Sequence, residues 1–167
     1  MNRVVATSLL TFAAVCAFGR PVPAQKPQPD AKTQRIDACS LLTTTQIKEH
    51  LPWEPMFDQF AVERDDIGVT GSACSYPTVI IQVLTYSASF VDAARKQAMA
   101  KQGRPEPVSG VGADAFVYHN PAGYVELIAR VGPRLLTLQA NIGRNETFES
   151  VKPKTIALAT ALAAKLP

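Results

Sequence analysis

Residues 124–142 contain two runs in which every second residue is apolar, and Gly132-Pro133 separates the two runs. This pattern predicts a β-hairpin. With a two-residue turn, one side of the ladder is apolar throughout and pairs Val125 with Ala140, Leu127 with Leu138 and Ala129 with Leu136. The opposite side is mixed and holds Glu126, Arg130, Gln139 and Leu135. A Gly-first two-residue loop suits a hairpin, and this alternation is typical of an antiparallel sheet with one covered face.

A short helix is expected before Pro52, which would end it. Thr43 is the predicted N-cap, and Gln46 three residues later completes a capping box. The segment 53–72 carries aromatic residues, then charged residues and glycines, so we expect it to hold a strand and a loop.

The segment 73–86 predicts a strand buried on both faces, because both of its alternating sets are mostly apolar. Ser89 is the predicted start of the next helix and Gly103 its end. An apolar stripe on that helix would consist of Phe90, Val91, Ala94, Ala98 and Met99.

The chain closes with a Pro/Gly loop at 104–112, a strand at 113–119, the hairpin and a last helix. Pro153 is tolerable if it lies in the first turn of that helix, with Ser150 or Lys152 as the cap. The apolar stripe of the helix would hold Ile156, Leu158, Ala159, Leu162, Ala163 and Leu166. This order of elements predicts an α+β domain, an antiparallel sheet flanked by helices.

Residues 1–24 have the pattern of a secretory signal peptide, with Arg3 in the basic region and an apolar run at 4–18. Cleavage is expected near Ala24. The apolar run is shorter than the ~20 residues that a transmembrane helix needs. Val15 is too bulky for a lipobox ahead of Cys16, so we expect no lipid anchor and expect Cys16 to leave with the leader.

Residues 25–35 are polar and Pro-rich and predict a disordered spacer, followed by a single domain at 36–167. The whole chain has 167 residues and a net charge of +3, and loss of two leader arginines brings the mature chain close to neutral. A nearly neutral domain lacks the basic surface that nucleic acid or anionic lipid requires.

The remaining cysteines, Cys39 and Cys74, predict one disulfide, because paired cysteines in exported domains are usually oxidised. A redox role is the alternative. It usually depends on a Cys-x-x-Cys setting, which neither residue has, so we interpret the disulfide as structural.

The surroundings of these cysteines are similar to a known group of proteins. The chain has Asp37-Ala38-Cys39-Ser40-Leu41-Leu42-Thr43, then Ala73-Cys74-Ser75-Tyr76, then Gly110-Val111-Gly112-Ala113-Asp114-Ala115-Phe116, and a closing Ala/Leu-rich helix. It thereby resembles exported bacterial domains of unknown function with a CSLL…C-x-Y…GVG pattern, which include actinobacterial envelope lipoproteins. The resemblance implies a PsbP-like fold and a cell-envelope binding module with a structural disulfide, and it carries no catalytic residues.

A ligand or partner surface is predicted at an aromatic and methionine cluster. Its members recur at helical spacing and are Trp53, Met56, Phe57 and Phe60. Aromatic residues that would add to this surface, if they share a sheet face, are Tyr76, Tyr118 and Tyr124. The alternative is that the cluster belongs to the core.

Catalytic and cofactor motifs are weak in this chain. The Gly110-Val111-Gly112 run precedes a predicted strand rather than a helix, so it indicates a bend and not a phosphate loop. His50 and His119 have no carboxylates at ligand spacing, and we predict no metal and no cofactor.

The sequence therefore predicts an exported periplasmic or secreted protein that is not an enzyme and binds a protein partner or an apolar ligand in the envelope. The alternative is an envelope-acting hydrolase that uses the carboxylates Glu54, Glu63, Asp65 and Asp66, although no Gly-x-Ser-x-Gly elbow is present.

Overall fold

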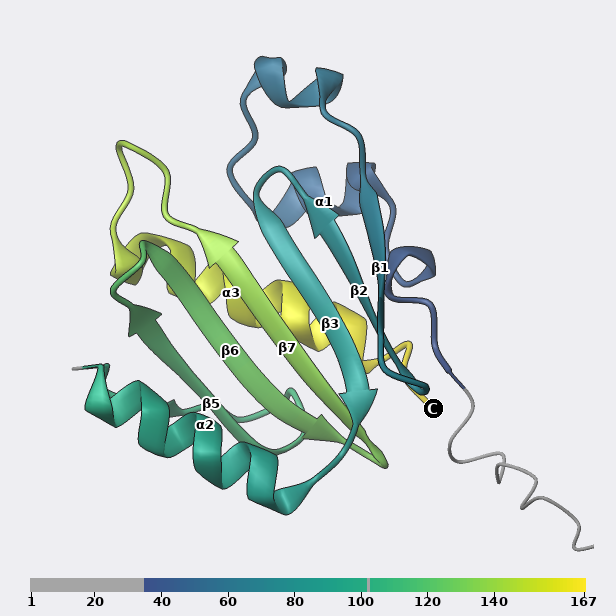
Figure 1. Cartoon of the computed structure of the whole chain (residues 1–167). Coiled ribbons are helices and arrows are strands. Elements are labelled where there is room, and N and C mark those ends of the chain that lie inside the picture. The colour runs from purple at the N-terminus through teal and green to yellow at the C-terminus, as the bar shows by residue number, and fades with distance from the viewer. Residues whose placement is uncertain (1–34, 102) are drawn as a thin grey trace, which may run out of the picture.

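The computed structural model describes residues 35–101 and 103–167. The predicted signal peptide, Cys16 and all of the predicted spacer except Arg35 lie outside these residues. The described chain has the predicted α+β architecture, a seven-stranded antiparallel sheet flanked by helices (Figure 1). The strand order is β1-β2-β3-β7-β6-β5-β4.

The strands are β1 (Glu63–Ile67), β2 (Gly71–Tyr76), β3 (Val79–Thr85), β4 (Glu106–Pro107), β5 (Ala113–Asn120), β6 (Tyr124–Val131) and β7 (Arg134–Asn141). The helices are α1 (Thr44–His50), α2 (Ala88–Ala100) and α3 (Phe148–Ala163), with the short 3-10 helices η2 (Ala38–Ser40) and η3 (Pro55–Gln59). After β3 the chain leaves the sheet through α2. It then builds the second half of the sheet from the far edge inwards, until β7 pairs with β3.

The hairpin of β6 and β7 has the register that the alternation predicts. Val125 pairs with Ala140, and Leu127 pairs with Leu138. Gly132 in the connecting turn has a φ of 55°, a conformation that L-residues with a side chain rarely adopt. The apolar side of this ladder is buried, so local pattern and tertiary packing agree here.

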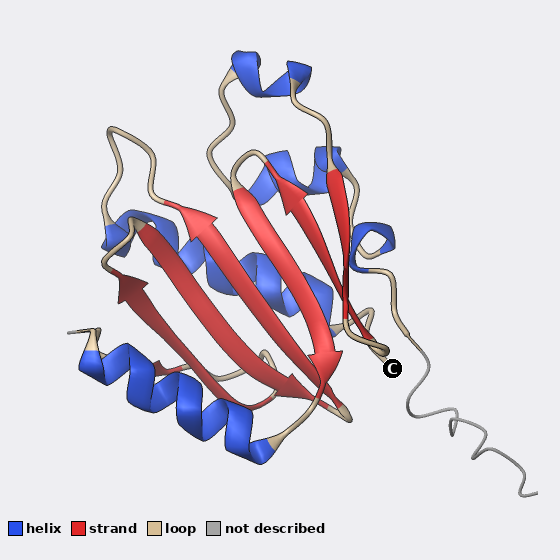
Figure 2. Ribbon diagram, viewed as in Figure 1, coloured by secondary structure: helices blue, strands red, loops and turns tan. Residues whose placement is uncertain are grey.

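The two faces of the sheet are packed by different helices (Figure 2). The helices α1, η2 and α3 cover one face, here called the α3 face, and α2 covers part of the other, here called the α2 face. Residues buried in the core of the α3 face include Ile81, Leu127, Leu138, Leu158 and Leu162. The smaller buried cluster on the α2 face consists of Val91, Ala98, Phe116, Tyr118, Ile128 and Leu135.

The start of α1 confirms the predicted capping box. The Thr43 hydroxyl accepts a hydrogen bond from the backbone N–H of Gln46, and the Gln46 side chain accepts one from the backbone N–H of Thr43. These two bonds satisfy donors that a helix N-terminus otherwise leaves unpaired. The helix ends at His50, shortly before Pro52.

Cys39 and Cys74 form the predicted disulfide, with 5.0 Å between their Cα atoms. It joins η2 to β2 on the α3 face. A hydrogen bond of 2.9 Å from the backbone N–H of Ala38 to the Ser72 hydroxyl holds the same two elements together. The segment before α1 is thereby attached to the sheet by covalent and polar contacts.

The prediction of a single strand at 73–86, buried on both faces, is wrong. Pro77 and Thr78 form a turn between β2 and β3, with Tyr76 paired to Val79. In β3 the residues facing α3 are buried, whereas those on the α2 face, such as Gln82, are only half-buried. Proline is a strong turn signal, but the apolar residues on both sides of Pro77 continue the alternation of a single strand and concealed the turn.

The helix α2 begins at Ala88 after Ser87, two residues before the position that a Ser89 cap implies. Its predicted stripe is also partly wrong, because Phe90 and Met99 are exposed and only Val91 and Ala98 are buried. The helix contacts the sheet mainly through β5, so a narrower stripe is sufficient.

The helix α3 also begins earlier than predicted. Thr147 is its N-cap and forms a reciprocal capping box with Ser150. Pro153 therefore lies beyond the first turn, inside the helix, where it removes one backbone hydrogen bond. The buried stripe of the helix consists of Val151, Thr155, Leu158, Ala159 and Leu162.

The run Gly110-Val111-Gly112 forms the predicted bend into β5. Gly110 and Gly112 both have positive φ angles. A Cβ on Gly112 would lie 2.2 Å from the backbone oxygen of Arg130, so only glycine fits this close approach to β6.

Candidate functional site

The four residues of the predicted aromatic cluster lie together in the connection between α1 and β1. Met56 and Phe60 are each 53% exposed, while Trp53 and Phe57 are half-buried. This connection is the loop with a short helix, η3, at the top of Figure 1. The cluster is thus largely a surface feature rather than part of the core.

The three tyrosines do not extend this surface as predicted. Tyr76 is buried on the α3 face, where its hydroxyl donates to the Leu42 carbonyl at 2.7 Å. Tyr118 is buried beneath α2, and Tyr124 is half-buried at the start of β6. The prediction is wrong for Tyr76 and Tyr118, because alternation along their strands turns both side chains into the core.

The connection between α1 and β1 is held by ring contacts. Trp53 and Phe57 pack edge to face with 5.9 Å between ring centroids, and Phe57 lies 6.4 Å from the ring of Phe60. Such aromatic pairs stabilise beyond the area they bury. The rings therefore give this connection a defined shape even though much of it is exposed.

A polar clamp fixes the same connection to α1. The Trp53 indole N–H donates to the Asp58 carboxylate at 3.0 Å, and Lys48 forms an ion pair with that carboxylate. The Lys48 ammonium also lies 4.8 Å from the Trp53 ring centroid. The hydrogen bonds from Lys48 and Trp53 hold the pKa of Asp58 below its ordinary value.

The surface of the connection is mixed, with exposed apolar side chains among polar and acidic ones. Met56, Phe60 and Val62, here called the apolar tip, are all exposed. Glu54 precedes η3 and Glu63 begins β1, and both are exposed. Within residues 35–101 and 103–167, neither glutamate has an ion-pair partner.

A small cavity of about 60 Å³, here called the Thr78 cavity, opens beside the apolar tip. It is lined by Pro52, Glu54, Phe57, Pro77, Thr78, Asn141 and Gly143. Thr78 is only 5% exposed, and its hydroxyl has no hydrogen-bond partner in the described part of the chain. The hydroxyl oxygen itself is shielded from solvent, so the polar side chains that line this cavity and can meet a guest are Glu54 and Asn141.

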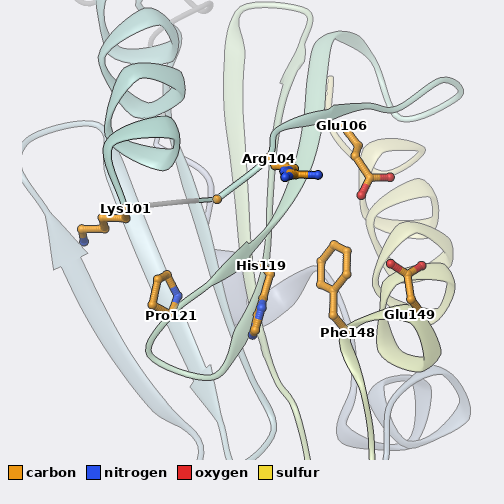
Figure 3. A pocket seen from close by; sticks show the side chains of 8 residues that line it. Lys101, Arg104, Glu106, His119, Pro121, Phe148 and Glu149 are labelled. Atoms are coloured by element: carbon orange, nitrogen blue, oxygen red, sulfur yellow. The ribbon is translucent and has the colours of Figure 1, made fainter.

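A second and larger cavity of about 470 Å³, here called the His119 cavity, lies at the other side of the same end of the sheet (Figure 3). Its walls come from the C-terminal end of α2, the end of β5 and the first turn of α3. They consist of Lys101, Gly103, Arg104, Glu106, His119, Pro121, Phe148 and Glu149.

Charges in the His119 cavity are divided between two sides. Glu106 and Glu149 are both bound to Lys152, at 3.1 and 2.8 Å, and these bonds raise the pKa of Lys152. Lys101 and Arg104 are exposed and form no ion pair within the described ranges. The uncompensated charge in this cavity is therefore positive.

The sequence did not single out the residues of the His119 cavity, apart from His119 itself. They come from three separate stretches of the chain, around Arg104, His119 and Phe148, and carry no shared motif. The same is true of Thr78, which looks like an ordinary turn residue. Only the packing of the strand ends brings these groups together.

The carboxylates of the hydrolase alternative do not converge. Asp65 and Asp66 are neighbours in β1, so they point to opposite faces of the sheet. Asp66 is paired with Arg35, and Glu54 lines the Thr78 cavity. In the described part of the chain, no group of three or more His, Cys, Asp or Glu residues is placed to hold a metal.

In comparisons with known proteins, no protein-family model, no curated protein and no solved structure matches this chain. The resemblance to envelope lipoprotein domains therefore stays a prediction, as does the PsbP-like assignment. No helix within residues 35–101 and 103–167 has the length and apolar character to cross a membrane.

Proposed function

We propose that this chain is an exported binding module of the cell envelope, without catalytic activity, that docks a protein partner through the apolar tip. The observation that carries the proposal is the exposure of Met56, Phe60 and Val62 on a connection whose other side chains hold it in shape. Large apolar side chains grouped on a surface are typical of protein-binding sites. The disulfide supports an oxidising compartment.

The chemistry of the partner follows from the border of the tip. Glu54 and Glu63 flank the apolar residues in the chain, while Lys48 is already engaged by Asp58. A complementary partner presents an apolar anchor flanked by basic side chains. The Thr78 cavity is lined by Glu54 and Phe57 of the same connection and has room for a small group of the partner.

Selection from a random peptide display library tests this proposal. The full chain is the bait, and affinities of selected peptides are measured from the fluorescence of Trp53, the single tryptophan. We expect peptides with an apolar residue flanked by Lys or Arg. Replacing Met56 and Phe60 together by serine should weaken binding by about tenfold or more, because two anchors are lost.

Val69 provides a matched control, because it is 91% exposed and lies in the turn between β1 and β2, away from the connection that bears the tip. A Val69→Ser variant should bind the selected peptides like the wild type. Three results would overturn the proposal. They are failure to select any peptide, selection of acidic peptides, and an equal loss of affinity from the Met56 and Phe60 replacement and from Val69→Ser.

A further inference from the structure

The His119 cavity has the size and the walls of a small-molecule site, and it is separate from the apolar tip. Its volume of about 470 Å³ falls within the range of about 300–1,000 Å³ that ligand pockets occupy. A neighbouring hollow of about 430 Å³ shares Lys101 and Pro121 with it, so the two adjoin around these residues. A ligand longer than one ring has room to extend past Lys101.

The electrostatics of the cavity favour an anion. Lys152 binds both acidic residues of one wall and so neutralises part of their charge. Figure 3 shows Arg104 above His119 and Phe148, with its guanidinium directed toward the side of Glu106, whereas the Lys101 side chain lies farther off and is directed away from Arg104. A guanidinium matches the geometry of carboxylate and phosphate oxygens.

Two further features belong to the same cavity. The first turn of the sixteen-residue helix α3 contributes Phe148 and Glu149, so the positive end of the helix dipole faces this region. The ring of Phe148 lies 5.6 Å from the ring of His119, with a tilt of 32°. The Lys152 ammonium lies 5.1 Å from the Phe148 ring centroid, so the two rings and this cation form a packed cluster next to Arg104.

We propose that the His119 cavity binds a small organic anion, with its carboxylate or phosphate group at Arg104 and an apolar body alongside Phe148 and His119. Carboxylate and phosphate oxygens share the geometry that a guanidinium recognises. The proposal does not depend on the apolar tip, because no residue is common to the two sites.

Binding of defined probes to the full chain tests this site. Phenyl phosphate and benzoate are titrated while backbone amide NMR signals are followed, with inorganic phosphate, benzyl alcohol and benzylamine as comparisons. We expect the two aromatic anions to bind with a Kd on the order of 1 mM, as suits fragments of this size. Their shifts should centre on the amides of Gly103, His119 and the first turn of α3.

The relative affinities of benzoate and phenyl phosphate distinguish the two anionic groups. An Arg104→Gln variant should lose about tenfold or more in affinity for both, because a charge-assisted hydrogen bond is removed. Arg144→Gln is the matched control: Arg144 is also exposed but lies in the connection between β7 and α3 and does not line the cavity. A Phe148→Leu variant should weaken phenyl phosphate more than inorganic phosphate.

Three results would overturn the proposal. One is the absence of saturable shifts with either aromatic anion up to about 10 mM. Another is an equal loss of affinity for the aromatic anions in the Arg104→Gln and Arg144→Gln variants, which would indicate general attraction of anions. The third is binding of benzylamine as tight as that of benzoate, which would mean that the cavity does not select negative charge.

Discussion

The α3 face and the α2 face use alternate residues of the same strands, yet they are built differently. The α3 face is covered by three helical segments, and its sheet residues are mostly aliphatic side chains that are almost fully buried. The α2 face has one helix, whose contacts are mainly with β5. Near the start of β6 this face carries Glu126, which accepts hydrogen bonds from Asn120 at 2.9 Å and from Gln139 at 3.4 Å.

The difference shows how the same strands can both stabilise the fold through one face and bury polar groups on the other. A dry aliphatic face with a disulfide stabilises the sheet, and this allows the other face to bury polar groups. Both candidate sites then lie at a single end of the sheet, where the turns and loops after β2, β5 and β7 meet α1 and α3 (Figure 1). Loops on a rigid scaffold are where binding residues usually concentrate.

The largest predicted difference concerns two leucines of β7 on opposite faces. Leu138 and Leu135 are both fully buried, but Leu138 lies under α3 between Leu127 and Ile81. We expect Leu138→Ala to lower the free energy of unfolding by about 3–5 kcal/mol and Leu135→Ala by about 2–3 kcal/mol. The thinner cover of the α2 face relaxes more easily around a cavity. Urea unfolding measures both, and an equal or larger loss for Leu135→Ala would contradict the comparison.

The next effect concerns the disulfide of the α3 face. Replacing Cys39 and Cys74 together by alanine should lower the free energy of unfolding by about 3–4 kcal/mol, since the unfolded chain regains the freedom of a long loop. The two cysteines are separated by 35 in residue number. Unfolding with and without a reducing agent checks this. The wild type should lose stability on reduction, and a double variant that still responds to the reductant would show that other thiols matter.

A smaller effect is predicted at high pH, with one tyrosine on each face. Burial raises the pKa of Tyr76, helped by the charge of Asp37, and burial followed by a hydrogen bond to Glu126 raises the pKa of Tyr118. The neutral hydroxyls therefore stabilise the fold fully below the ordinary pKa of 10.0, and this stability is lost as pH rises above it. Each group contributes at most about 1.4 kcal/mol per pH unit there.

Tyr76→Phe and Tyr118→Phe should each flatten the fall in stability above pH 10.0, with the larger change for Tyr118→Phe, whose pKa is also raised by a direct bond to a carboxylate. Unfolding curves at several alkaline pH values give the slopes. Slopes that neither change alters would exclude these two hydroxyls as the cause.

The smallest effect is local and tests the clamp of the connection that bears the apolar tip. The pKa of Asp58 is lowered, so its bonds to Lys48 and Trp53 persist at neutral pH and are lost as pH falls through a value below the ordinary 3.8. The emission of Trp53 should shift in that range without global unfolding. Asp58→Asn should remove the transition, and a transition centred above 3.8 would contradict the assignment.

Sequence reasoning was most successful where the signal is local. The register of β6 and β7 follows from alternation, and the start of α1 follows from Thr43 and Gln46. The pairing of Cys39 with Cys74 follows from there being two cysteines after the predicted leader. The sequence predictions were wrong for the start of α2 and for the turn of Pro77 and Thr78, where neighbouring residues carry two competing signals.

The amino-acid sequence by itself determined the α+β class, the central hairpin, the disulfide and the position of the aromatic cluster, because these depend on short-range periodicity and residue type. Tertiary structure alone decided that Tyr76 and Tyr118 point into the core while Met56 and Phe60 stay exposed. It also brought Arg104, the end of β5 and the first turn of α3 around one cavity. Burial and convergence depend on which distant elements pack together, and a local pattern in the chain does not encode that.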